Sequence, residues 1–148
     1  MYSNILRIVL IDDDVVSAKM LEKMIKQAMP DLTMEIANFQ DPRSALAHIK
    51  EKDIHIVITD IEMPHISGQE VLKEVKGMSK GIKLAVITAS NSLLTALSCF
   101  MDGADGYLLK PYKVQNVRDL LLQFHANLLL WREIFETCHK TSRPAAGA

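Results

Sequence analysis

Acidic, basic and hydroxyl side chains stand at the ends of short apolar runs, where they could together transfer a phosphoryl group. Three aspartates (Asp12–Asp14) follow the first run, Asp60 follows a second, and Thr88 and Lys110 close two later runs. If these side chains meet, the carboxylates repel one another, and a divalent cation is the least costly way to keep them ionised. Hard oxygen ligands with room for water and phosphate favour Mg²⁺.

A carboxylate can itself accept a phosphoryl group and form an aspartyl phosphate, and Asp60 is the candidate for this role. In-line transfer depends on positioning and charge neutralisation more than on acid-base chemistry. The Lys110 ammonium would supply a cation, and the Thr88 hydroxyl would donate a hydrogen bond to the phosphoryl oxygens. These residue types therefore indicate phosphoryl transfer to Asp60.

The elements that must position these residues are five strands. Three runs are short, rich in β-branched residues and nearly all apolar, which is typical of strands covered on both faces, and two weaker runs complete the set. The predicted strands are Ile5–Ile11, Met34–Asn38, Ile54–Thr59, Ile82–Thr88 and Tyr107–Leu109.

Helical patterns fill the intervals between the predicted strands. The first helix stops at Pro30, which cannot continue it, and the second opens with Asp41 as N-cap and Pro42 at the first helical position. The other three are a helix that opens with the capping box Ser67-x-x-Glu70, the segment Leu93–Met101 and a helix from near Val114.

Five β-then-α units with short connections predict an α/β fold, a doubly wound parallel sheet with helices on both faces. Such sheets bind ligands beyond the carboxyl ends of their strands, at the topological switch point. Because Asp12–Asp14, Asp60, Thr88 and Lys110 all stand at strand ends, the fold would gather them at one edge.

The length of 148 residues fits a single domain. The formal net charge of the chain is -1. Lys and Arg are scattered, which argues against nucleic-acid binding. No apolar run is long enough to span a membrane and no signal peptide is evident, so we expect a cytoplasmic protein without a membrane partner. Cys99 and Cys138 lack a CxxC spacing and are interpreted as reduced thiols.

Four stretches resemble the response-regulator receiver family of two-component signalling, in that family's order and at its usual separations. They are RIVLIDDD, VITDIEMPHISG, LAVITAS and GADGYLLKP. The resemblance, to receivers of the single-domain chemotaxis type, implies a flavodoxin-like sheet of order 2-1-3-4-5 with an extended C-terminal helix. We therefore expect a receiver domain over 1–125, a C-terminal helical extension over 126–140 and a disordered tail over 141–148.

The resemblance also implies roles for the acidic residues. Asp60 would be the phosphoacceptor, phosphorylated from the phosphohistidine of a histidine kinase or by a phosphotransfer protein. Mg²⁺ would be held by Asp13, Asp60 and the backbone carbonyl of Glu62, with Asp12 acting through water, while Asp14 would be a bystander or helix cap. The chain would then be a phosphorylation-dependent switch that catalyses only its own phosphoryl transfer and dephosphorylation and changes its interaction surface.

Further implied roles concern the phosphoryl group and its readout. Thr88 and Lys110 would hold the phosphoryl oxygens, and Tyr107 would be an aromatic switch that turns inward when Thr88 moves. Receivers similar to this chain have a cis peptide bond after the lysine, so the Lys110-Pro111 bond is expected to be cis.

Two residues are predicted to set the lifetime of the aspartyl phosphate. Glu62 and Ser90 lie two positions beyond Asp60 and Thr88, so they should flank the path of an attacking water. A carboxylate at Glu62 would either orient or repel that water, and the sign of its effect stays open.

Other interpretations are open at this point. The aspartates at 12–14 could only cap a helix, Lys110 could be a solvated surface residue and Thr88 a strand former, but their co-occurrence at strand ends favours the functional reading. An aspartyl-phosphate phosphohydrolase usually has a second aspartate where this chain has Glu62, and a flavin binder would need a phosphate loop where these aspartates repel phosphate. A phosphate-independent adaptor is disfavoured because every expected reactive residue is present.

The last helix carries an apolar stripe that continues past the expected receiver. Its members alternate steps of three and four, which is the pattern of a coiled-coil seam. Through about Phe124 the stripe is needed to cover the sheet, but Leu128, Trp131 and Phe135 extend it further. Exposed apolar area of this size usually marks an interface, so we predict a homodimer contact or docking on a downstream output domain. The stripe comprises Val114, Val117, Leu121, Phe124, Leu128, Trp131, Phe135 and Cys138.

Overall fold

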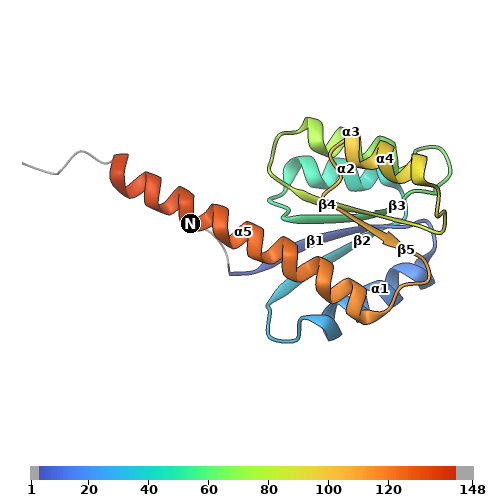
Figure 1. Cartoon of the computed structure of the whole chain (residues 1–148), viewed down its shortest axis with the longest axis horizontal. Helices are drawn as coiled ribbons and strands as arrows, with labels where there is room; N and C mark the ends of the chain where they lie inside the picture. The colour runs from blue at the N-terminus through green and yellow to red at the C-terminus, as the bar shows by residue number, and fades with distance from the viewer. Residues whose placement is uncertain (1–3, 143–148) are drawn as a thin grey trace, which may run out of the picture.

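A computed structural model, which describes residues 4–142, contains five strands and five helices in strict alternation (Figure 1). The strands are β1 (Leu6–Ile11), β2 (Met34–Phe39), β3 (Ile56–Asp60), β4 (Lys83–Thr88) and β5 (Gly106–Leu109). The helices are α1 (Val15–Ala28), α2 (Pro42–Glu51), α3 (Gly68–Gly77), α4 (Leu93–Met101) and α5 (Val114–Ser142). The strands pair in parallel in the order β2-β1-β3-β4-β5, which confirms the predicted topology.

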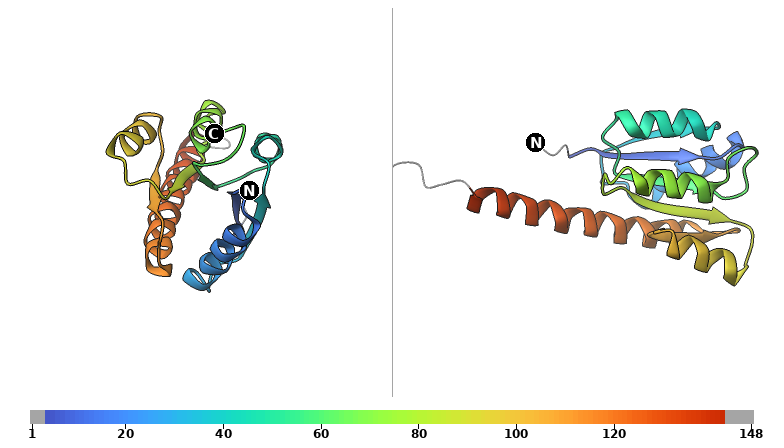
Figure 2. Two further views of the ribbon diagram at one scale, coloured as in Figure 1. Left: turned by 90° about the vertical axis from the view of Figure 1, so that its right-hand side faces the viewer. Right: turned by 90° about the horizontal axis from the view of Figure 1, so that it is seen from above.

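The sheet has a layer of helices on each face (Figures 1 and 2). Helices α1 and α5 cover one face, and α2, α3 and α4 cover the other. Each layer closes over its own set of buried apolar side chains, and the sheet separates the two sets. The predicted doubly wound α/β architecture is therefore confirmed.

Strand side chains alternate between these two sets, which explains why β1, β3 and β4 are nearly all apolar. In β3, Ile56 and Ile58 belong to the core under α1 and α5, whereas Val57 belongs to the core under α2, α3 and α4. Because both faces are covered, a charged side chain has no solvated position in the middle of β3. Asp60 lies at the carboxyl end of the strand, where its buried carboxylate meets Lys110 and the backbone of the following loop.

Side-chain caps mark the starts of α2 and α3, as the sequence predicted. A carboxylate oxygen of Asp41 accepts a hydrogen bond from the Arg43 backbone N–H at 3.0 Å, and Pro42 occupies the first helical position. The Ser67 hydroxyl accepts from the Glu70 backbone N–H at 3.2 Å. Both helix starts agree with the capping patterns in the sequence.

Helix α5 is the longest element, and its two halves have different surroundings. Val117, Leu121 and Phe124 of the first half are buried against the sheet, whereas Trp131 and Phe135 are about half exposed. The helix runs past the edge of the sheet where the strands begin (Figure 1). The predicted extension of the C-terminal helix is therefore confirmed.

The end of α5 corrects the expectation of a disordered tail over 141–148. Thr141 and Ser142 are helical, and their hydroxyls donate to the carbonyl oxygens of Thr137 and Cys138 one turn earlier, at 3.2 and 2.5 Å. Hydroxyl residues read as loop formers can instead bond back to the helix in this way. Residues 143–148 lie outside the described part of the chain.

Within residues 4–142, no helix combines the length and the apolar character that a membrane span needs.

His55 makes the stability of the fold sensitive to mild acid. The Arg7 backbone N–H donates to His55 Nδ1 at 2.9 Å, which requires that nitrogen to be unprotonated. Burial lowers the pKa of His55 below its ordinary value, although the charge of Asp53 opposes the shift. Since the unfolded chain takes up this proton near pH 6.5 and the folded chain only at lower pH, acid favours unfolding.

We therefore expect the free energy of unfolding to fall as pH decreases from about 6.5 toward the lower folded pKa of His55. Urea unfolding measured at several pH values should show a shallower dependence for His55→Gln than for the wild type. His139→Gln, at an exposed position on α5, is the matched control and should keep the wild-type dependence. An unchanged dependence in His55→Gln would contradict the assignment.

Candidate functional site

Asp60 is a nearly buried carboxylate at the carboxyl end of β3, the central strand of the sheet; it is 4% exposed. One of its oxygens, Oδ2, lies 2.5 Å from Lys110 Nζ, and Oδ1 accepts a hydrogen bond from the Glu62 backbone N–H at 3.1 Å. Lys110 directly follows β5, so the fold brings two strand ends together at this edge, as predicted from topology.

Asp60 and Lys110 each stabilise the charged form of the other, which offsets the cost of burying the two charges. Burial raises the pKa of Asp60, and the Lys110 ammonium opposes that shift. Burial by itself would lower the pKa of Lys110, but contact with Asp60 and the charge of Asp12 raise it above its ordinary value. Lys110 therefore stays protonated at neutral pH and favours the ionised form of Asp60, which is the nucleophilic form.

The three aspartates after β1 have different surroundings. Asp12 is partly buried, which raises its pKa, and it accepts a hydrogen bond from the Asp14 backbone N–H at 2.9 Å. Asp14 caps α1, because its carboxylate accepts from the Val16 backbone N–H and the Ser17 hydroxyl, each at 3.0 Å. Asp13 is exposed. The interpretation of Asp14 as a helix cap is confirmed, and the roles of the other two stay predictions.

The acidic residues fit a hydrated Mg²⁺ better than a metal enclosed by protein ligands. Within residues 4–142, no three side chains of His, Cys, Asp or Glu form a group that could hold a metal ion. However, burial raises the pKa of both Asp12 and Asp60, and a bound cation would offset that cost. Mg²⁺ needs only one or two carboxylates because it keeps several waters. Asp12, Asp13, Asp60 and the Glu62 carbonyl are sufficient donors for such an ion.

Thr88 connects the end of β4 to the loop after Asp60. Its buried hydroxyl donates to Glu62 Oε1 at 2.6 Å and accepts from the Ser90 backbone N–H at 3.0 Å. The pKa of Glu62 is lowered overall. Burial by itself would raise it, but the hydrogen bond from Thr88 helps to outweigh that effect. The sequence indicated Glu62 through its backbone carbonyl and its position near the attacking water. The contact between its side chain and Thr88 was not anticipated.

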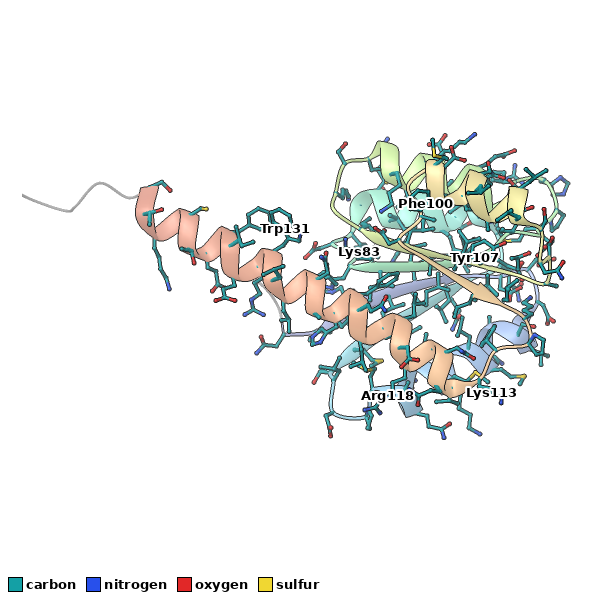
Figure 3. All side chains as sticks on the ribbon, in the orientation of Figure 1. Lys83, Phe100, Tyr107, Lys113, Arg118 and Trp131 are labelled. Atoms are coloured by element: carbon teal, nitrogen blue, oxygen red, sulfur yellow. The ribbon has the colours of Figure 1, made fainter. Side chains whose placement is uncertain are left out.

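Tyr107 of β5 packs against the core under α2, α3 and α4 (Figure 3). Its hydroxyl lies near the hydroxyl of Thr88. Burial raises the pKa of Tyr107, and the nearby Thr88 hydroxyl opposes this shift. The Tyr107 hydroxyl is nevertheless buried without a hydrogen bond of acceptable geometry to any described group. A tyrosine that switches in response to Thr88 must lie next to it, and this position meets that requirement.

Two backbone features belong to the same edge of the sheet. The Lys110-Pro111 bond is cis, as predicted. Gly68, at the start of α3, packs so closely on β3 that a Cβ atom there would lie 2.1 Å from the backbone oxygen of Asp60. The sequence does not reveal this contact, because no local pattern encodes the packing of a helix start against a strand residue eight positions earlier.

These features define a flavodoxin-like α/β domain whose candidate site lies at the carboxyl ends of its parallel strands. Residues 8–122 match the family model of the response regulator receiver domain. The chain therefore belongs to the response regulator receiver domain family and is a receiver of two-component signalling.

Similar curated proteins include response regulators from plants and bacteria. Two-component response regulator ORR4 of Oryza sativa subsp. indica is 28% identical over 128 residues, which cover 74% of this chain and 55% of that protein. Transcriptional regulatory protein FlgR of Helicobacter pylori is 35% identical over 108 residues, which cover 73% of this chain and 26% of that protein. The chain thus spans about half the length of the first relative and a quarter of the second.

Solved receiver structures share the fold. A CheY-like response regulator receiver domain protein from Methanospirillum hungatei JF-1 has a TM-score of 0.70 and 26% identity, with 87% of this chain and 98% of that chain covered. A receiver domain protein from Clostridium thermocellum has a TM-score of 0.76 and 23% identity, with 85% of this chain and 98% of that chain covered. The second similarity supports the fold alone.

Proposed function

We propose that this receiver accepts a phosphoryl group on Asp60 from the phosphohistidine of a histidine kinase or a phosphotransfer protein, with Mg²⁺ bound beside it. The observation that carries the proposal is the buried Asp60 carboxylate held 2.5 Å from the Lys110 ammonium where the strands end. A fixed cation beside a buried carboxylate suits a phosphoryl acceptor. Transfer brings the negatively charged phosphoryl oxygens next to Asp60, where the Lys110 ammonium can neutralise them.

In the transfer, an Asp60 oxygen forms the new O–P bond while the P–N bond to the donor imidazole breaks, and the imidazole nitrogen keeps the electron pair. No general base is needed at Asp60, because Lys110 already favours its ionised form. Lys110 then pairs with the phosphoryl oxygens. Asp13, Asp60 and the Glu62 carbonyl, with Asp12 acting through water, would hold Mg²⁺, and the bound ion would supply further positive charge.

Thr88 is the group that would change partners on phosphorylation. Its hydroxyl now donates to Glu62. A phosphoryl group on Asp60 offers charged acceptor oxygens at the same edge, and a move of Thr88 toward them would alter the surroundings of Tyr107. The expected output is a changed interaction surface around β4, β5 and α4, in which Tyr107 and Thr88 act as the switch.

The proposal is tested by incubating the protein with Mg²⁺ and a small phosphodonor and measuring its intact mass. We expect each chain to gain one phosphoryl group, and a chelator should suppress this gain. Continued release of phosphate over many turnovers would instead indicate a phosphohydrolase. No mass gain and no turnover would indicate a phosphate-independent adaptor.

Removal of the Glu62 carboxylate should prolong the life of the aspartyl phosphate. Glu62→Ala frees the Thr88 hydroxyl to bond the phosphoryl oxygens and removes a carboxylate that could orient an attacking water. We expect dephosphorylation to slow about two- to fivefold, as one exchanged hydrogen bond allows. Ser90→Ala should have a smaller effect, because Ser90 bonds Thr88 through its backbone N–H, which alanine keeps. An unchanged rate in Glu62→Ala would contradict this role.

In this proposal the receiver unit is residues 1–125, and residues 126–140 form a helical extension of α5. The chain acts on no other substrate, since its chemistry is limited to gain and loss of its own phosphoryl group. Its net charge of -1 gives no basis for nucleic-acid binding, and we place its activity in the cytoplasm.

A further inference from the structure

The second half of α5 carries an apolar stripe that the described part of its own receiver leaves open to solvent. Leu128 packs at the rim of the core under α1 and α5, but Trp131, Ile134 and Phe135 beyond it are 48%, 37% and 52% exposed. The Trp131 and Phe135 rings contact each other one turn apart, with centroids 5.7 Å apart. Figure 3 shows Trp131 on the side of α5 that faces the sheet earlier in the helix. The stripe thus continues the buried face of α5 beyond the sheet.

We infer that this stripe is the contact surface of an antiparallel homodimer, in which the α5 extensions of two copies pack side by side. The direction follows from the position of the receiver. In a parallel pair, the second helix would continue beside Val117 and Phe124, where the sheet of the first copy already lies (Figure 1). In an antiparallel pair, the two receivers lie at opposite ends of the paired helices and do not overlap.

One antiparallel register makes the stripe complementary to itself. When the two Glu133 backbones are level with the twofold axis, Trp131 packs against Phe135 of the second copy, and this contact occurs twice by symmetry. The Glu133 side chains themselves lie about 160° around the helix from Trp131, on the outer face. The next layer outward on each side pairs Leu128 with Cys138 of the second copy. Both of these layers are apolar, and Ile134 covers the flank of the central one.

The charged side chains beside the stripe are compatible with this register. Arg132 pairs with Glu136 on its own helix at 3.3 Å. With a rise of about 1.5 Å per residue, Arg132 would lie about 3 Å along the axis from Glu136 of the second copy. The two arginines and two glutamates then form a neutral cluster at the centre of the contact.

The exposed area determines how strong this contact can be. The half-exposed aromatic rings, together with Ile134, Leu128 and Cys138, would bury roughly 400 Å² per copy, or about 800 Å² in total. Stable interfaces bury about 1,200–2,000 Å². We therefore expect a reversible dimer with a dissociation constant in the micromolar range.

Trp131 is the only tryptophan of the chain, so its emission reports on the contact directly. Between about 1 and 500 μM protein, its emission should shift to shorter wavelength while sedimentation shows conversion to dimer. Phe135→Glu should stay monomeric over this range. Leu129→Glu is the matched control, since Leu129 is 45% exposed but lies about 200° around the helix from Trp131. A wild type that stays monomeric, or an equal loss of dimer in Leu129→Glu, would overturn the inference.

Disulfide trapping tests the direction of the helices. Leu128→Cys places a thiol opposite Cys138 of the second copy, so mild oxidation should link this variant into dimers. The wild type and the double variant Leu128→Cys/Cys138→Ser should not be linked. Two thiols ten residues apart on one helix are about 15 Å apart and cannot pair within a copy, and Cys99 is fully buried. Efficient linkage of the wild type through Cys138 would show a parallel pair and overturn the antiparallel arrangement.

Discussion

The Asp60→Asn variant should gain no mass after treatment with Mg²⁺ and a small phosphodonor, whereas the wild type should gain one phosphoryl group per chain. The amide keeps the shape of the carboxylate but is not a nucleophile, so the loss should be complete. Its oxygen can still accept the Glu62 backbone N–H that Asp60 accepts now, and Lys110 can move its ammonium toward solvent, so the fold should persist. Intact-mass spectrometry and thermal unfolding of both proteins check the two parts of this result.

Asp14→Asn is the matched control for that experiment. Asp14 caps α1 through the Val16 backbone N–H and the Ser17 hydroxyl, and asparagine is an equally good N-cap, so labelling should be retained. An equal mass gain in Asp60→Asn and the wild type would refute Asp60 as the acceptor. Loss of labelling in both variants would show that the experiment reports on the acidic cluster rather than on one nucleophile.

Gly68→Ala should lower the free energy of unfolding by about 2–4 kcal/mol and slow phosphorylation, although it adds a single methyl group. The new Cβ would lie 2.1 Å from the backbone oxygen of Asp60 and 2.9 Å from the Cα atom of Ile61. Backbone atoms of a central strand cannot rotate away as a side chain can, so α3 must move. That movement also strains the hydrogen bond from the Gly68 N–H to the Ile61 carbonyl. Urea unfolding and the rate of mass gain measure the two effects.

Gly77→Ala is the control in the same helix. A Cβ at Gly77 meets nothing within 4 Å, so alanine should be neutral or stabilise the protein by up to about 1 kcal/mol. If Gly68→Ala unfolds at the same urea concentration as the wild type, the inference that α3 packs too closely on Asp60 to accept a methyl group is wrong.

The sheet and most of the site edge could be predicted because strand burial leaves a simple signal. β3 is apolar from Ile56 to Ile58 and β4 from Leu84 to Ile87, so the polar residues Asp60 and Thr88 mark both the strand ends and the site. Parallel order then places Lys110 near them without any knowledge of loop shape. The start of α2 at Asp41 was predictable for a local reason, because a cap and its helix are adjacent in sequence.

Two features of the site that could not be predicted from the sequence depend on how loops fold back on the sheet. The Thr88 hydroxyl bonds the Glu62 side chain across 26 positions, and no periodicity encodes such a pair. The crowding of Gly68 against Asp60 arises from the path of the loop between β3 and α3. The helical state of Thr141 was missed because its residue type favours loops, while its hydroxyl bonds back to the previous turn.

Helix α5 can act as a mechanical lever. It begins at Val114, four residues after Lys110, and its 29 residues extend about 43 Å. The two buried turns from Val117 to Phe124 would be the pivot, and the part of the helix from there to Ser142 is about 27 Å long. A tilt of about 5° at the pivot would carry the tip by about 2 Å, enough to separate a layer of packed side chains. A small displacement near Asp60 that tilted α5 would therefore move the far end of the helix the most.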